Sequence, residues 1–201
     1  MKKRTGLGVI TLAAGLCCWL PVPGHALPGY SVDEVRTWMQ GHPTLRADRR
    51  EGLRIHRTDV PSRRFTFQAS VFPVGGFRRP DDAESLSSSI RNQDFSVIRR
   101  EEFLLVDYDQ PVTLARLEEA LRTIYGPDIH ADYRRAPATY GYIATETTNS
   151  QGEVRSGNLY TYWIELAVDT NGVATAGKLN VLLSEDTDRL ESYLQALESI
   201  R

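Results

Sequence analysis

The pair Asn171-Gly172, set between two long runs of alternating apolar and polar residues, constrains the fold of this chain more than any other feature. Asn-Gly is preferred at the two central positions of a type I′ turn, which joins antiparallel strands. Counting outward from the turn matches charge with opposite charge and apolar with apolar side chains: Glu165 with Lys178, Ile164 with Leu179, and Tyr162 with Val181. The sequence therefore predicts a long hairpin whose first strand buries Tyr160, Tyr162, Ile164, Leu166 and Val168.

Further strands are predicted wherever apolar and polar residues alternate. They are expected over residues 53–57, 64–72, 95–99 and 103–108, and the segment 139–147 also reads as extended. A hairpin is expected to join the first two strands through Thr58 to Arg63. The charged run Arg100-Glu101-Glu102 is expected to form the turn between residues 95–99 and 103–108.

Helices are predicted at both ends of the chain and in its middle. Ser31 and Glu34 form a capping box, which marks the start of the first helix. Leucines at helical spacing follow Thr113 until Gly126-Pro127, a weaker pattern covers residues 83–91, and a last helix begins near Thr187. The predicted fold is α+β, an antiparallel sheet built largely from hairpins and packed by an N-terminal, a central and a C-terminal helix.

The first 26 residues are typical of a secretory signal peptide. A basic start at Lys2, Lys3 and Arg4 precedes an apolar run, and Gly24-His25-Ala26 resembles a cleavage site. The apolar run of about 14 residues is shorter than the roughly 20 that cross a bilayer, so no transmembrane anchor is expected after cleavage. We therefore expect cleavage near Ala26 and an extracytoplasmic chain, periplasmic or secreted.

Both cysteines lie within this leader. Lipidation of Cys17 or Cys18 is an alternative, although neither follows the small residue that lipidation requires. After cleavage, no thiol, disulfide or cysteine-bound metal is expected in residues 27–201. These residues are expected to form a single domain, with a split into two subdomains near 108–112 as the alternative.

Charge is unevenly distributed along the mature chain. Residues 27–100 hold 13 basic and 9 acidic side chains, whereas residues 101–201 hold 8 basic and 17 acidic ones. Arg54 and His56 are expected on the polar face of one strand and Arg64 on its partner. Such a patch suits an anionic polymer, an anionic envelope component or an acidic protein partner. Because the mature chain is acidic overall, no nucleic acid partner is expected.

A second cluster follows Gly126-Pro127. If this segment is extended, Asp128, His130 and Asp132 project from one face and offer ligands for a divalent metal, with Asp107 or Asp109 as neighbours. One alternative is that His130 acts as a general base oriented by a carboxylate. Another is that these polar side chains simply face water while Ile129, Ala131 and Tyr133 face the core.

Two function classes remain open at this point. The sequence lacks the local motifs of serine hydrolases, zinc helices, P-loops, dinucleotide-binding folds and EF-hands. This favours a non-enzymatic binding or accessory module without a cofactor, which engages a protein partner or an anionic envelope component. The alternative is a small metal-assisted hydrolase that uses Asp128, His130 and Asp132.

Overall fold

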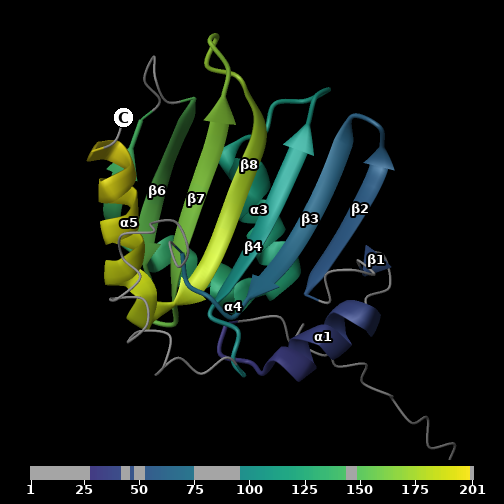
Figure 1. Cartoon of the computed structure of the whole chain (residues 1–201). Coiled ribbons are helices and arrows are strands. Elements are labelled where there is room, and N and C mark those ends of the chain that lie inside the picture. Colours follow the sequence, from purple (N-terminus) through teal and green to yellow (C-terminus); the bar gives the residue numbers. More distant parts are fainter. Residues whose placement is uncertain (1–27, 42–45, 48–52, 75–95, 144–148, 200–201) are drawn as a thin grey trace, which may run out of the picture.

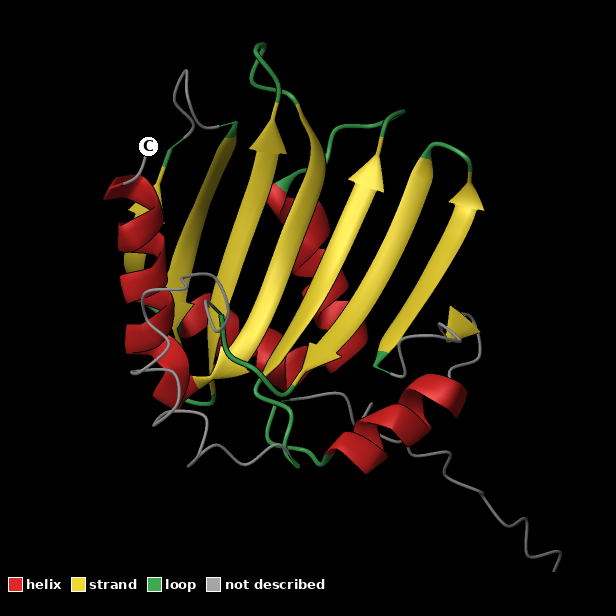
Figure 2. Cartoon of the chain, viewed as in Figure 1, coloured by secondary structure: helices red, strands yellow, loops and turns green. Residues whose placement is uncertain are grey.

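A computed structural model describes residues 28–41, 46–47, 53–74, 96–143 and 149–199. Within these ranges the chain forms one eight-stranded antiparallel sheet with helices on both faces (Figures 1 and 2). This confirms the predicted α+β class. The leader, and with it the predicted signal peptide, lies outside the described residues, as does the helix expected over residues 83–91. None of the described helices is long and apolar enough to cross a membrane.

The strands follow the chain as β1 (Arg46–Ala47), β2 (Arg54–Val60), β3 (Arg63–Ser70), β4 (Arg100–Asp107), β5 (Ala138–Tyr142), β6 (Ser150–Ser156), β7 (Tyr160–Val168) and β8 (Ala174–Leu183). Their order in the sheet is β1-β2-β3-β4-β8-β7-β6-β5. β4 and β8 therefore pair in one sheet, although they lie on either side of residues 108–112 in the sequence. The division of the chain into domains stays a prediction.

The helices are α1 (Val32–Gly41), α3 (Leu114–Tyr125), α4 (Pro127–Arg135) and α5 (Thr187–Ser199), the last preceded by a short 3-10 turn, η2 (Ser184–Asp186). The capping box of α1 is confirmed, because the Ser31 amide donates to the Glu34 carboxylate at 2.9 Å and the Glu34 amide donates to Ser31 Oγ at 3.3 Å. Thr113 caps α3, and Gly126 ends it with a φ of 88°.

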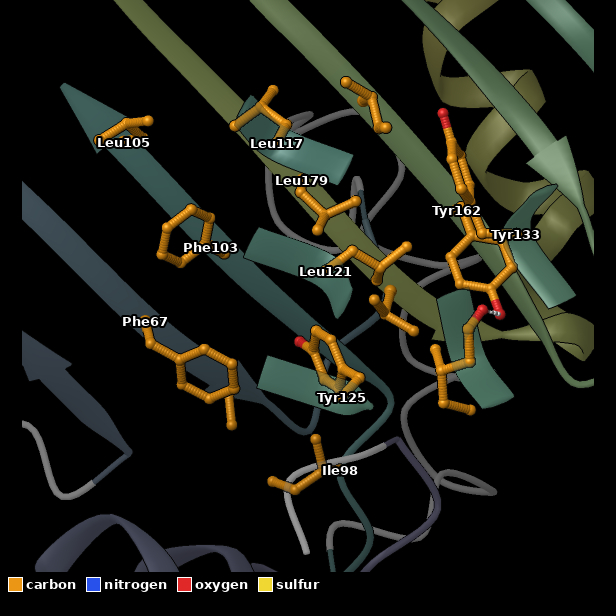
Figure 3. Packing of buried hydrophobic residues seen from close by; sticks show 14 of the residues in the cluster. Phe67, Ile98, Phe103, Leu105, Leu117, Leu121, Tyr125, Tyr133, Tyr162 and Leu179 are labelled. Carbon is orange, nitrogen blue, oxygen red and sulfur yellow. Dashed lines mark hydrogen bonds between the residues drawn. The ribbon is translucent and has the colours of Figure 1, made fainter. Parts of the chain in front are cut away.

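Two apolar cores lie on opposite faces of the sheet. α1, α3 and α4 cover one face, where their apolar side chains pack on alternate residues of β2, β3, β4, β8 and β7; Figure 3 shows this core from close by. α5 lies on the other face at the β5–β6 side of the sheet (Figure 1), where Leu190 and Leu194 pack in one cluster with Trp163 and Leu182. Trp163, which points away from Tyr162, is therefore buried because both faces of β7 are covered.

The hairpin of β7 and β8 has the predicted register but a different turn. Glu165 pairs with Lys178, as expected. Gly172 has a φ of 77°, whereas Asn171 has no positive φ, so the turn is not type I′. Instead, the loop has three residues between Asp169 and Val173, and the Asp169 amide donates to the Val173 carbonyl at 2.9 Å. A one-residue register shift between Ala167 and Val168 restores the predicted pairing.

The turn predicted at Arg100-Glu101-Glu102 is wrong. These residues begin β4, which runs without interruption to Asp107 and alternates buried with partly buried residues. Glu101 pairs with Ala69 on β3 and with Val181 on β8, both of which belong to the core covered by α3. A glutamate therefore occupies a core position in a central strand.

Candidate functional site

The predicted basic residues Arg54, His56 and Arg64 lie on one face of the sheet. In the β2–β3 pairing, His56 is opposite Thr66 and Thr58 is opposite Arg64. Residues directly opposite in paired strands share a face, and side chains alternate along a strand. Because Ile55 belongs to the core beneath α1 and α3, its neighbours Arg54 and His56 point to the other side. We call this side of β2, β3 and β4 the β2–β4 face.

Arg46 adds a basic side chain that the sequence did not assign to this group. It lies on the two-residue strand β1, directly opposite His56. Arg46 and Arg64 are exposed and His56 is partly buried. None of these three side chains has a hydrogen bond or an ion pair to another described residue, whereas Arg54 does have a partner. The alternation of polar and apolar residues did not place Arg46 on this face, because β1 has only two residues.

The β2–β4 face continues into an aliphatic strip on β4. Leu104 lies opposite Thr66, and Val106 lies opposite Arg64. Both side chains are partly exposed. No described helix covers this face over β2, β3 and β4, since α3 and α4 lie behind the sheet and α5 lies at its β5–β6 side (Figure 1). Basic and aliphatic side chains are thus presented side by side.

A polar network lies on the same side of the sheet, on strands β5, β7 and β8. Lys178 pairs with Glu165 at 2.6 Å, and its ammonium lies 5.3 Å from the centre of the Trp163 ring. The Tyr142 hydroxyl donates to Glu165 at 2.6 Å and accepts from Trp163 Nε1 at 3.1 Å. Tyr142 reaches across β6 at Gly152, where a Cβ atom would lie 2.7 Å from its hydroxyl. The predicted Glu165–Lys178 pair is therefore one part of a four-residue network.

Gly152→Ala is expected to destabilise the chain by about 2 kcal/mol, because overpacking of this size forces backbone or side chains to shift. The added methyl would lie 2.4 Å from the Ile164 carbonyl oxygen. Urea unfolding measures the change. Gly141→Ala on neighbouring β5 is the matched control, since its methyl would meet Gly152 at an ordinary 3.8 Å. An equal loss in both variants would contradict the role assigned to Gly152.

The extended geometry expected for Asp128, His130 and Asp132 is wrong, because these residues lie on α4. Pro127 at the first helical position, Asp128 in the first turn and arginines in the last turn are helix signals that the sequence already carried. Asp128 and Asp132 are one turn apart, whereas His130 projects from a different side of the helix. The three side chains therefore do not share a face.

Asp132 instead holds the loop that connects β6 and β7. Its buried carboxylate accepts hydrogen bonds from the Asn158 amide at 3.0 Å, the Leu159 amide at 3.2 Å and the Tyr162 hydroxyl at 2.8 Å. Gly157 allows this close approach, because a Cβ there would lie 2.2 Å from an Asp132 oxygen. The carboxylate is thus already occupied within the chain.

No group of histidine, cysteine, aspartate or glutamate side chains in the described ranges is arranged to hold a metal ion. Asp107, considered as a neighbouring ligand, pairs with Arg116 at 2.7 Å and accepts the Asp109 and Gln110 amides at 3.0 Å. These bonds lower the pKa of Asp107, with the Arg116 hydrogen bond as the main cause. The metal-assisted alternative stays an untested prediction.

Glu101 is a buried acidic residue that was not identified as a candidate from the sequence. Its side chain is completely buried, and neither carboxyl oxygen has a hydrogen-bond partner. The Tyr125 hydroxyl on α3 is also buried without a partner, although the two groups are close enough to affect each other's pKa. Burial raises the pKa of Glu101 to about 8, and the nearby Tyr125 hydroxyl lowers it by less. Glu101 is therefore mostly a neutral acid at pH 7.

Comparison with protein families, curated proteins and solved structures gives no match for this chain.

Proposed function

We propose that the chain is a binding module that holds an anionic partner on the β2–β4 face. The observation that supports this is the placement of Arg46, His56 and Arg64 on three adjacent strands with no partner among the described residues. An arginine fork can pair with two oxygens of a carboxylate or phosphate, so such a face favours anions. The leader predicted from the sequence would deliver the module outside the cytoplasm, where envelope components and secreted proteins are its candidate partners.

The distribution of carboxylates supports the same proposal. Glu102 is the acidic residue that β4 presents to this face, and it lies opposite Gln68 rather than opposite a basic residue. With respect to the side chains that the structure describes, Arg46, His56 and Arg64 therefore keep their capacity to bind an external anion. Attraction of this kind weakens as salt screens the charges.

Arg64→Glu is expected to weaken binding of polyglutamate, used as a simple anionic probe, by on the order of tenfold at low salt. Arg135→Glu is the matched control, because it makes the same charge change on exposed α4 behind the sheet. Fluorescence anisotropy across a salt series measures both. Equal weakening in the two variants, or no binding to the natural chain at low salt, would reject the proposed function.

A further inference from the structure

The aliphatic strip on β4 limits what kind of anionic partner fits the β2–β4 face. Leu104 and Val106 are two residues apart on one strand, so their side chains stand about 7 Å apart on the same side. Arg64 lies directly beside Val106 on β3, and His56 lies one strand farther out. A partner that contacts the basic side chains therefore also meets aliphatic surface.

The charge on the two sides of this strip is unequal. Lys178, which lies opposite Leu104 on β8, is already paired with Glu165 at 2.6 Å. On the other side, Arg46, His56 and Arg64 have no such partner among the described residues. Among the described side chains, the face thus offers an aliphatic strip with unpaired basic groups on its β3 side. It is matched by a surface that is apolar along one line and acidic along a parallel line.

An amphipathic helix has this pattern, because residues three and four apart form one stripe and the neighbouring positions form the next. Its diameter of about 10 Å covers two strand spacings of about 4.8 Å each, so a helix seated on β4 reaches Arg64 on β3 and His56 on β2, whereas Arg46 on β1 lies one spacing farther out. A sulfated or phosphorylated polymer gains nothing from Leu104 and Val106. Membrane binding scales with the apolar area that enters the bilayer, and the two partly exposed side chains of Leu104 and Val106 supply little of it.

We propose that the β2–β4 face binds an acidic amphipathic helix of a partner protein, with its apolar stripe on Leu104 and Val106 and its carboxylates facing Arg64 and His56. This inference rests on the proposed function. It adds the chemistry of the partner and assigns a binding role to two aliphatic residues.

The test uses the whole chain and three probes: a designed helical peptide with parallel leucine and glutamate stripes, a peptide of the same composition with the stripes scrambled, and polyglutamate. The striped peptide is expected to bind about tenfold more tightly than the scrambled one, which corresponds to burial of one or two aliphatic side chains. Amide shifts in NMR spectra are expected to change along β3 and β4.

Leu104→Ser is expected to weaken the striped peptide about tenfold while leaving polyglutamate binding unchanged. Leu114→Ser is the matched control, since Leu114 is an exposed leucine on α3 behind the sheet. Urea unfolding checks that the variants fold. Val106→Thr, which keeps a β-branched side chain of similar shape, tests the same contact if Leu104→Ser is unstable.

The outcomes separate the two proposals. Equal binding of striped and scrambled peptides, with no effect of Leu104→Ser, would overturn the helix inference and leave the anion-binding function in place. Failure of polyglutamate and both peptides to bind would overturn both. Tighter binding to anionic vesicles than to the striped peptide would overturn the helix inference and show that the face binds a membrane surface. Self-association of the chain that Arg64→Glu abolishes would show that the face binds a second copy of this chain and not a partner's helix.

Discussion

Glu101→Gln is expected to gain about 4 kcal/mol of stability relative to the natural chain as the pH rises from 5 to 9, because the variant lacks the buried group that titrates. The natural carboxyl is completely buried between β3 and β8, and burial raises its pKa to about 8. In the unfolded chain a glutamate has a pKa near 4.5. The size of the change in stability follows from the difference between the folded and unfolded pKa values of Glu101.

The sign follows from which state binds the proton more tightly. Between pH 4.5 and pH 8, the folded chain keeps a proton on Glu101 that the unfolded chain has released. Stability therefore falls as the pH rises through this window and levels off above about pH 8. The nearby phenols of Tyr125 and Tyr160 have raised pKa values, mainly because of burial, and stay neutral over the same range.

Urea unfolding at pH 5, 7 and 9 measures the effect. The pH dependence of the difference is the readout, because a buried glutamine amide has its own cost of lost hydration at every pH. Glu102→Gln is the matched control, since it removes a carboxylate from the next residue of β4 on the other face. A difference between Glu101→Gln and the natural chain that is constant from pH 5 to pH 9 would show that Glu101 does not titrate in this window.

Glu101 also shows where reasoning from the sequence fails. Three consecutive charged residues between two apolar runs are typical of a turn, and that interpretation assumes that each of them is ionised and hydrated. A protonated glutamate behaves as a neutral polar side chain, so it can occupy a core position in a central strand. Whether these residues form a turn or a buried strand is decided by the pairing of β4 with β3 and β8, which involves residues distant in the sequence.

The elements that could be predicted are those with local signals. The capping box at Ser31 and Glu34 places the start of α1, and Thr113 and Gly126 bound α3. The matched pairs of β7 and β8 give their register even though the turn differs, because a mismatch there would place charges against apolar side chains. Local sequence signals therefore predict the bounds of these helices and the pairing of these strands.

The candidate sites were predicted less evenly. Alternation alone places Arg54, His56 and Arg64 on one face, but Arg46 joins them only through the two-residue strand β1. On α4, the helix signals of Pro127 and Asp128 compete with an alternating pattern of apolar and polar residues, and the segment is helical in the structure. Over so short a segment, the two periods of 2 and 3.6 residues cannot be separated by pattern, and capping chemistry decides.

Asp132→Ala is expected to destabilise the chain by about 3 kcal/mol or more, since removing the shared acceptor leaves buried donors unpaired. The carboxylate joins α4 to the β6–β7 connection through the Asn158 and Leu159 amides and the Tyr162 hydroxyl. Tyr162 is completely buried beside Tyr133, as Figure 3 shows, so its hydroxyl has no access to water. Urea unfolding and near-ultraviolet circular dichroism of the tyrosines measure the loss.

Asp128→Ala, one turn earlier at the exposed start of α4, is the matched control and is expected to change stability by about 0.5 kcal/mol or less. Tyr162→Phe removes one of the three donors, so combining it with Asp132→Ala is expected to cost less than the sum of the two single changes. Strict additivity would contradict a shared hydrogen bond. A metal-dependent stability that Asp132→Ala abolishes would instead restore the metal-binding role, because Asp132 would then hold an ion rather than the β6–β7 connection.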